Sequence, residues 1–220
     1  MEIIFWLCLF LVAYPYAIYP AVLILLNRLS RRRLHAGDAS FEPSVSVILP
    51  VHNEARRVEE KLRNLLALDY PREKLQILVI GDGCTDDSLE RAVRAGGSSV
   101  KAIPLAQRQG KAAALNAGLE HATGEIVVFT DAGIMLEPHS LRRLVAHFSD
   151  ERIACVSGED YIEGADSEGL YGRLELLLRR EEARLHSIAG ASGCYYAQRR
   201  SICRPFISGM APDFLSVLIT

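Results

Sequence analysis

The sequence predicts an α/β domain with a mainly parallel sheet and helices on both faces. Short apolar, β-branched segments alternate with helical segments, and several of the apolar segments end at a carboxylate. Near-continuous apolar runs of this length are typical of buried parallel strands. Strands are expected at residues 45–49, 75–80, 100–103, 126–130 and 153–157, and helices at residues 54–68, 85–95, 110–118, 138–148 and 170–188.

Local signals support these elements in chain order. Pro50 is expected to stop the first strand, and the following helix has apolar residues at helical spacing. Thr85 or Asp86 can cap the second helix, and Pro138 suits the first turn of a later one. The loop 190–193 is rich in glycine and serine and precedes a short apolar run.

The N-terminus predicts a membrane anchor. No charged residue occurs from Ile3 to Leu26, and these roughly 24 residues suffice to cross a hydrocarbon core of ~30 Å. Pro15 and Pro20 are expected to kink this helix. A cleaved signal peptide is the alternative, but it needs a positive N-terminal region and this chain begins Met1-Glu2.

Basic residues follow the apolar segment, at Arg28 and Arg31–Arg33. The positive-inside bias therefore predicts an inner or plasma membrane protein whose following domain is cytoplasmic. The expected organisation is an anchor at 1–27, a basic linker at 28–43 and a catalytic domain at 44–220. The chain stops inside an expected helix, so we expect the catalytic domain to be incomplete at its C-terminus.

Composition narrows the function. A net charge of −2 gives no electrostatic case for a nucleic-acid partner. The five cysteines form no Cys-x-x-Cys pair and no metal-ligand spacing with histidine, which favours reduced cysteines in a cytosolic setting. A dinucleotide-binding oxidoreductase would need Gly-x-Gly-x-x-Gly after the first strand, where residues 50–53 read Pro-Val-His-Asn.

Three carboxylates lie where an α/β sheet binds its ligands. Asp82 and Asp131 each follow an apolar run, and Asp213 lies in Ala-Pro-Asp-Phe near the C-terminus. Ligands of open α/β sheets bind just beyond the carboxyl ends of the strands. Carboxylates there can hold a base edge, a divalent cation or an acceptor proton, although each aspartate alone could simply stabilise a turn.

Four motifs occur in order: residues 47–54 (VILPVHNE), 80–88 (IGDGCTDDS), 110–118 (GKAAALNAG) and 128–133 (VFTDAG). Together they closely resemble the family 2 glycosyltransferases, inverting enzymes with the GT-A fold. Within that family the chain looks most like the membrane-bound processive branch of cellulose, hyaluronan and poly-N-acetylglucosamine synthases. The resemblance extends from about Ser44 to Leu218.

The resemblance implies a donor site for a UDP-sugar. Pro50, His52 and Glu54 match the family's turn beside the nucleotide base, and His52 can stack on uracil where the family often has tyrosine. Asp82 matches the motif that contacts uracil and ribose, although its first acid is replaced by Gly81. Lys111 matches the lysine near the diphosphate, with Asn116 (the motif's asparagine) supporting the loop.

The resemblance also implies a metal ion and a general base. Asp131 matches the first acid of the family's metal motif, and Gly133 replaces the second. Binding of Mg²⁺ or Mn²⁺ would then depend on Asp131, donor phosphates and water, a ligand set that Mg²⁺ accepts. Asp213 matches the base that takes a proton from the acceptor hydroxyl.

The sequence thus predicts a hexosyltransferase that moves a sugar from a UDP-sugar to a glycan or lipid-linked acceptor at the bilayer. Two alternatives stay open. One is a dolichyl- or polyprenyl-phosphate sugar synthase of the same fold. The other is a catalytically degenerate assembly protein, suggested by the missing acids at Gly81 and Gly133.

Overall fold

A computed structural model describes residues 2–30, 37–159, 170–185, 188 and 190–219. The chain forms two compact units. The first comprises Met1–His35 and Tyr161–Ala189, and the second comprises Ala36–Asp160 and Gly190–Thr220.

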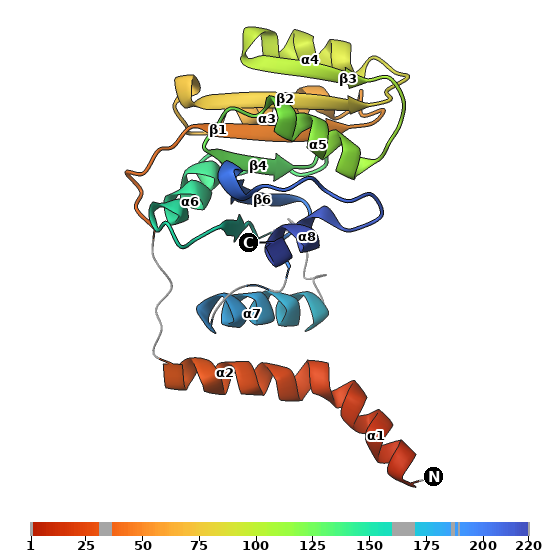
Figure 1. Cartoon of the computed structure of the whole chain (residues 1–220), viewed down its shortest axis with the longest axis vertical. Helices are drawn as coiled ribbons and strands as arrows, with labels where there is room; N and C mark the ends of the chain where they lie inside the picture. The colour runs from red at the N-terminus through yellow and green to blue at the C-terminus, as the bar shows by residue number, and fades with distance from the viewer. Residues whose placement is uncertain (1, 31–36, 160–169, 186–187, 189, 220) are drawn as a thin grey trace. The chain divides into compact units, whose positions relative to one another are not determined.

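The second unit is built on a six-stranded mixed sheet in the order β3-β2-β1-β4-β6-β5 (Figure 1). Its strands are β1 (Val45–Val51), β2 (Leu75–Asp82), β3 (Val100–Leu105), β4 (Ile126–Thr130), β5 (Cys155–Ser157) and β6 (Tyr195–Arg199). The first four pair in parallel, and β6 pairs antiparallel with both β4 and β5. The expected mainly parallel α/β fold is confirmed.

Helices cover both faces of this sheet. They are α3 (Val58–Leu66), α4 (Ser88–Gly96), α5 (Lys111–His121), α6 (Ser140–Ala146) and α8 (Pro212–Ile219), with 3₁₀ turns at Arg72–Lys74, Gly97–Ser99, His147–Ser149 and Arg200–Ile202. Apolar side chains of α3, α4 and α6 share one core with Val47 and Leu49. On the other face α5 packs closely, because a Cβ added at Gly118 would lie 2.5 Å from Ile48.

Several elements differ from expectation, among them β1, α3 and β6. β1 continues through Pro50, since β4 pairs only with Val45–Ile48 and the missing N–H of Pro50 is not needed beyond that point. The turn at Glu54–Arg57 delays α3 until Val58. The short apolar run after the glycine-rich loop forms β6, which lies between β4 and β5.

The first unit contains α1 (Glu2–Ala13), a π-helical turn (Tyr14–Ile18), α2 (Tyr19–Ser30) and α7 (Leu170–Leu185). Within the described residues, one helix is long enough and apolar enough to cross a membrane, and it comprises Glu2–Ser30. Pro15 falls in the first turn of the π-helical segment, so the expected distortion occurs there. The helix continues to Ser30, and the basic run Arg31–Arg33 lies outside the described residues.

Polar contacts join α2 to α7. The Tyr19 hydroxyl donates to Glu182 Oε1 at 2.8 Å. The Asn27 amide donates to the backbone oxygen of Glu181 at 2.7 Å and to its Oε2 at 2.8 Å. Within the described residues, α7 therefore belongs to the same compact unit as the N-terminal helix.

Candidate active site

The carboxyl ends of β1, β2 and β4 meet at one edge of the sheet, because these strands are parallel neighbours. His52 follows β1, Asp82 ends β2, and Asp131 follows β4. The backbone N–H of Asp131 donates to the carbonyl of Cys194, which joins the glycine-rich loop to the same edge. The candidate residues thus come together as the parallel strand order predicts.

Lys111 and Asp131 form the centre of the candidate site. The Lys111 ammonium lies 2.8 Å from Asp131 Oδ1 and 2.9 Å from Oδ2, and it also donates to the Gly193 carbonyl at 2.9 Å. Both side chains remain partly exposed, at 39% and 34%. The Lys111 ammonium therefore joins the start of α5 to the end of β4 and to the glycine-rich loop.

Asp213 lies beside the same loop, in the first turn of α8. A Cβ added at Gly193 would be 3.3 Å from Asp213 Oδ2, so that carboxylate lies directly against the glycine. Asn116 holds the preceding segment, since it donates to the Phe206 carbonyl at 2.9 Å and accepts from the Phe206 N–H at 2.7 Å. The expected base is thus brought near the Lys111–Asp131 pair through Gly193.

Asp82 makes backbone contacts that the sequence did not predict. It is buried, and its two carboxylate oxygens accept the backbone N–H groups of Gln109 and Gly110 at 2.6 and 2.8 Å. Asp82 therefore fixes the loop that leads into α5 and its Lys111. Its contact with uracil and ribose stays a prediction.

The turn after β1 is held by side chains from the next strand and helix. His52 Nδ1 lies 2.6 Å from the backbone oxygen of Asp82, and the Glu54 N–H donates to Ser88 Oγ at 2.8 Å. Asn53 adopts a left-handed φ of 53° and exchanges hydrogen bonds with Thr85. Pro50 is half-buried at the end of β1. These hydrogen bonds hold the turn against the end of β2 and the start of α4, and its place beside the nucleotide base stays a prediction.

Sequence reasoning missed two residues of α3. Lys61 is fully buried and donates to Thr130 Oγ1 at 2.9 Å and to the Ile134 carbonyl. Asn64 forms two 2.8 Å hydrogen bonds with the backbone of Leu136. The available signal was position: Lys61 stands three residues after Val58, on the apolar stripe of the helix.

The site fits a metal ion held by one carboxylate and the donor. Among the described residues, no three His, Cys, Asp or Glu side chains group into a protein-only metal site. Asp131, however, is partly exposed, already holds a cation with both oxygens, and has open space beside Gly133. A hard divalent cation that keeps waters and phosphate oxygens suits such a site.

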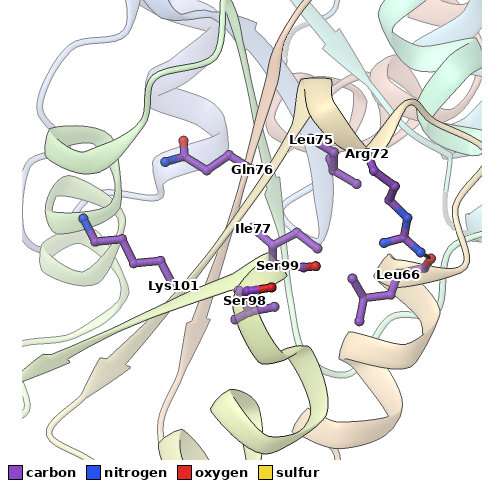
Figure 2. A pocket seen from close by; sticks show the side chains of 9 residues that line it. Leu66, Arg72, Leu75, Gln76, Ile77, Ser98, Ser99 and Lys101 are labelled. Atoms are coloured by element: carbon purple, nitrogen blue, oxygen red, sulfur yellow. Dashed lines mark hydrogen bonds between the residues drawn. The ribbon is translucent and has the colours of Figure 1, made fainter.

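The pocket in Figure 2 is separate from the candidate site. It measures about 440 Å³ and is lined by Leu66, Arg72, Leu75, Gln76, Ile77, Ser98, Ser99, Val100 and Lys101. Leu75 and Val100 begin β2 and β3, so the pocket lies at the amino ends of the strands. It contains no carboxylate and does not include the candidate residues.

Comparison with protein families gives one match over most of the chain. The model of the family described as glycosyl transferase family 2 matches residues 46–206. That range includes the turn after β1, Lys111 and Asp131, and ends before Asp213.

Curated relatives include undecaprenyl-phosphate 4-deoxy-4-formamido-L-arabinose transferases. The protein of Klebsiella pneumoniae is 39% identical over 106 residues, covering 46% of this chain and 32% of its own. That of Salmonella paratyphi A is 30% identical over 185 residues, covering 79% and 53%. The chain thus spans about a third to a half of the length of these relatives.

Among solved structures, the chain is similar to a mannosyltransferase from Pyrobaculum calidifontis in complex with GDP-Man and Mn²⁺. The TM-score is 0.82 with 28% identity, covering 94% of this chain and 60% of that one. A glucosyl-3-phosphoglycerate synthase from Mycobacterium tuberculosis, in complex with Mn²⁺ and UDP, has a TM-score of 0.52 with 26% identity over 74% of this chain and 59% of that one. The sheet unit therefore has the GT-A fold expected from the sequence.

Proposed function

Since this chain belongs to glycosyl transferase family 2, we propose that it is an inverting transferase that moves a sugar from a UDP-sugar to a lipid-linked acceptor hydroxyl at a membrane. The single observation that carries this proposal is that Lys111 joins Asp131 to the Gly193 carbonyl, while the Asp213 carboxylate lies beside the same Gly193. These groups supply a cation for the diphosphate, a metal ligand and a base, which are the three functions that the transfer needs.

Lys111 binds the donor in this proposal. Its ammonium is partly exposed and exchanges Asp131 for the diphosphate oxygens when the donor enters. Positive charge at that position stabilises the negative charge that develops on the leaving nucleotide. Asp131 is then free to hold a Mg²⁺ or Mn²⁺ ion, which would supply further charge stabilisation to the leaving phosphate.

Asp213 is the proposed general base. It is half-buried at the start of α8, beside the loop whose carbonyl holds Lys111. A carboxylate there takes the proton of the acceptor hydroxyl as its oxygen attacks the anomeric carbon. Attack from the face opposite the leaving nucleotide inverts that carbon.

The acceptor is lipid-linked in the main proposal because the relatives named above act with undecaprenyl phosphate. A polyprenyl phosphate that itself accepts the sugar is the second candidate, favoured by the same names. Its phosphate oxygen is already ionised near neutral pH and needs no base. The role of Asp213 therefore separates the two candidates, as developed in the Discussion.

The proposed location is the cytoplasmic face of the cell membrane. The helix Glu2–Ser30 is the candidate anchor, and Arg28 with the basic run after it gives the expected cytoplasmic side. The boundaries 1–27, 28–43 and 44–220 remain part of this proposal.

The test is UDP binding by the full chain in detergent, measured by calorimetry with and without Mn²⁺, beside Asp131→Ala. We expect binding that needs Mn²⁺ and is lost in the variant. A panel of UDP- and GDP-sugars then identifies the donor. If the folded chain binds neither UDP nor any of the UDP- and GDP-sugars, with or without Mn²⁺, the proposal is contradicted and the degenerate assembly protein is favoured.

A further inference from the structure

Lys61 is the one lysine that the described part of the chain buries completely. It extends from α3 into the core between that helix and the sheet, among Val58, Leu62 and Leu65. Burial lowers the pKa of its ammonium to about 8, while the nearby Asp131 carboxylate acts in the opposite direction. An apolar residue would be the ordinary choice at such a position, so the charge calls for an explanation.

The contacts of Lys61 bracket the candidate metal ligand. Its ammonium donates to the hydroxyl of Thr130, the last residue of β4, and to the carbonyl of Ile134. Asp131 lies between these two anchor points in the sequence. In the same turn, a Cβ added at Gly133 would meet no atom within 4 Å.

Anchoring alone does not require a charge. One helical turn after Lys61, the neutral side chain of Asn64 holds Leu136 of the same loop through two hydrogen bonds. What Lys61 adds is a buried positive charge near Asp131, beside the partly exposed one of Lys111. When Lys111 leaves Asp131 to bind a diphosphate, the electrostatic interaction between Lys61 and Asp131 remains.

We propose that Lys61 is a positioning residue for the donor site: it ties Thr130 to Ile134 and so holds the turn that carries Asp131 in place while Lys111 engages the donor. This inference rests on the proposed function, in which Asp131 binds the metal and donor. Lys61 itself touches neither.

The test compares Lys61→Met with Asn64→Leu in the full chain in detergent. Each variant removes two hydrogen bonds to the same loop, but only the first removes a charge. We expect Lys61→Met to weaken Mn²⁺-dependent UDP binding by about tenfold or more, as loss of a supporting partner of a metal ligand typically does. Asn64→Leu should stay within about threefold of the wild type in the same titration. Equal losses in the two variants, or no loss in Lys61→Met, would overturn the proposal.

Hydrogen exchange gives a readout that does not depend on nucleotide binding. The N–H groups of Asp131 and Ile134 are hydrogen-bonded in the fold, to Cys194 and Asp131 respectively. We expect them to exchange faster in Lys61→Met than in Asn64→Leu. If wild-type protein binds no UDP, the proposed function fails, and this comparison alone still decides whether Lys61 positions the turn.

A third variant, Thr130→Val, tests the proposal if Lys61→Met does not fold. Thr130→Val removes one anchor of Lys61 but keeps its charge. If Lys61→Met does not fold, faster exchange at Asp131 and Ile134 in Thr130→Val supports the proposal, and unchanged exchange there overturns it.

Discussion

At the scale of single residues, the candidate site places two ammonium groups near one carboxylate. Asp131 is held by the exposed ammonium of Lys111 and lies near the buried ammonium of Lys61. A second acid at position 133 would have offset one of these charges, but glycine stands there. The site is therefore poor in negative charge before the donor arrives, and a diphosphate supplies what is missing.

Restoring the second acid should strengthen metal binding. A side chain at position 133 meets no atom within 4 Å, and the residue's φ is outside the left-handed region, so Gly133→Asp fits the turn. We expect Mn²⁺ affinity without nucleotide to rise about tenfold, because affinity for hard cations follows the ligand charge. Calorimetric titration with Mn²⁺ measures this, with Gly133→Ala as the control. An increase shared by both variants would contradict the electrostatic reason.

Asp213→Asn should separate the two candidate acceptors. The amide keeps the shape of the side chain but cannot take a proton. If the acceptor is a hydroxyl, kcat falls by about 10²–10⁴ while the KM for the donor stays nearly constant. If the acceptor is a phosphate, kcat changes little. Rates of sugar transfer to lipid-phosphate and to glycan-lipid acceptors provide the measurement, and a large rise in donor KM would argue against a role as base.

Burial of Lys61 predicts a pH-dependent stability. Its pKa is about 8 in the folded chain against 10.5 for a free lysine. Between these values the unfolded chain binds more protons, so the free energy of unfolding rises with pH, by up to about 1.4 kcal/mol per pH unit. Below pH 8 both states are protonated and this gain is absent.

Lys61→Met should lack this gain. Urea unfolding of both proteins at pH 8, 9 and 10 gives the comparison, in which the contributions of the other groups cancel. We expect the stability of the wild type to increase relative to the variant as pH rises. Parallel pH profiles would show that the Lys61 ammonium is well solvated.

At the scale of elements, close packing of α5 on the sheet places Lys111. The helix approaches β1 through Gly118, where an added Cβ would lie 2.5 Å from a methyl carbon of Ile48. Asp82 fixes the other end, because it accepts the N–H groups of the two residues before Lys111. Helix position and ammonium position are thus set by one glycine and one buried carboxylate.

Gly118→Val should therefore destabilise the fold. Overpacking at a tight helix–sheet contact costs about 1–3 kcal/mol, which outweighs the small gain in helix propensity over glycine. Glu120→Val on the exposed side of the same helix is the control, since it introduces the same side chain without the collision. Thermal unfolding measures both variants. Equal melting temperatures would show that α5 can move away from Ile48.

The elements also show what sequence patterns can and cannot predict. β4 is found at its expected bounds, Ile126–Thr130, because a fully buried strand leaves a continuous apolar run. β6 was not assigned as a strand, since its antiparallel place between β4 and β5 depends on contacts distant in sequence. Lys61 was missed for the same reason. Periodicity shows that it lies on the buried face of its helix, but not that the Thr130 hydroxyl and the Ile134 carbonyl accept its hydrogen bonds.

For the candidate site, motif order predicted which residues come together but not the contacts that each of them makes. Asp131 and Lys111 are adjacent as a donor site requires, and Asp213 lies at the same loop. The contact of Asp82 with uracil and ribose stays a prediction, and the structure adds that Asp82 is buried and accepts the backbone N–H groups of Gln109 and Gly110. A sequence shows that an acid follows a strand, but not which backbone groups of a later loop will reach it.

At the scale of the whole molecule, membrane attachment depends on the first helix in our proposal. Side chains of Glu2–Ser30 are apolar and mostly exposed within the first unit, which leaves them for contact with lipid. The polar contacts with α7 fall on the second half of this helix, at Tyr19 and Asn27. The first half is apolar after Glu2 and exposed, including at Leu7 and Leu11, so it is the part most suited to the hydrocarbon core.

Charges in that first half should release the chain from membranes. We expect the double variant Leu7→Arg with Leu11→Arg to move to the soluble fraction after alkaline extraction, because each arginine near the centre of a span costs about 2.5–3.5 kcal/mol. Leu29→Arg adds a charge in the last turn of α2, where the basic flank begins, and should remain in the membrane fraction. Release of the wild type itself by alkaline extraction would contradict a spanning helix and would place the enzyme on the membrane surface, with its acceptor reached from outside the bilayer.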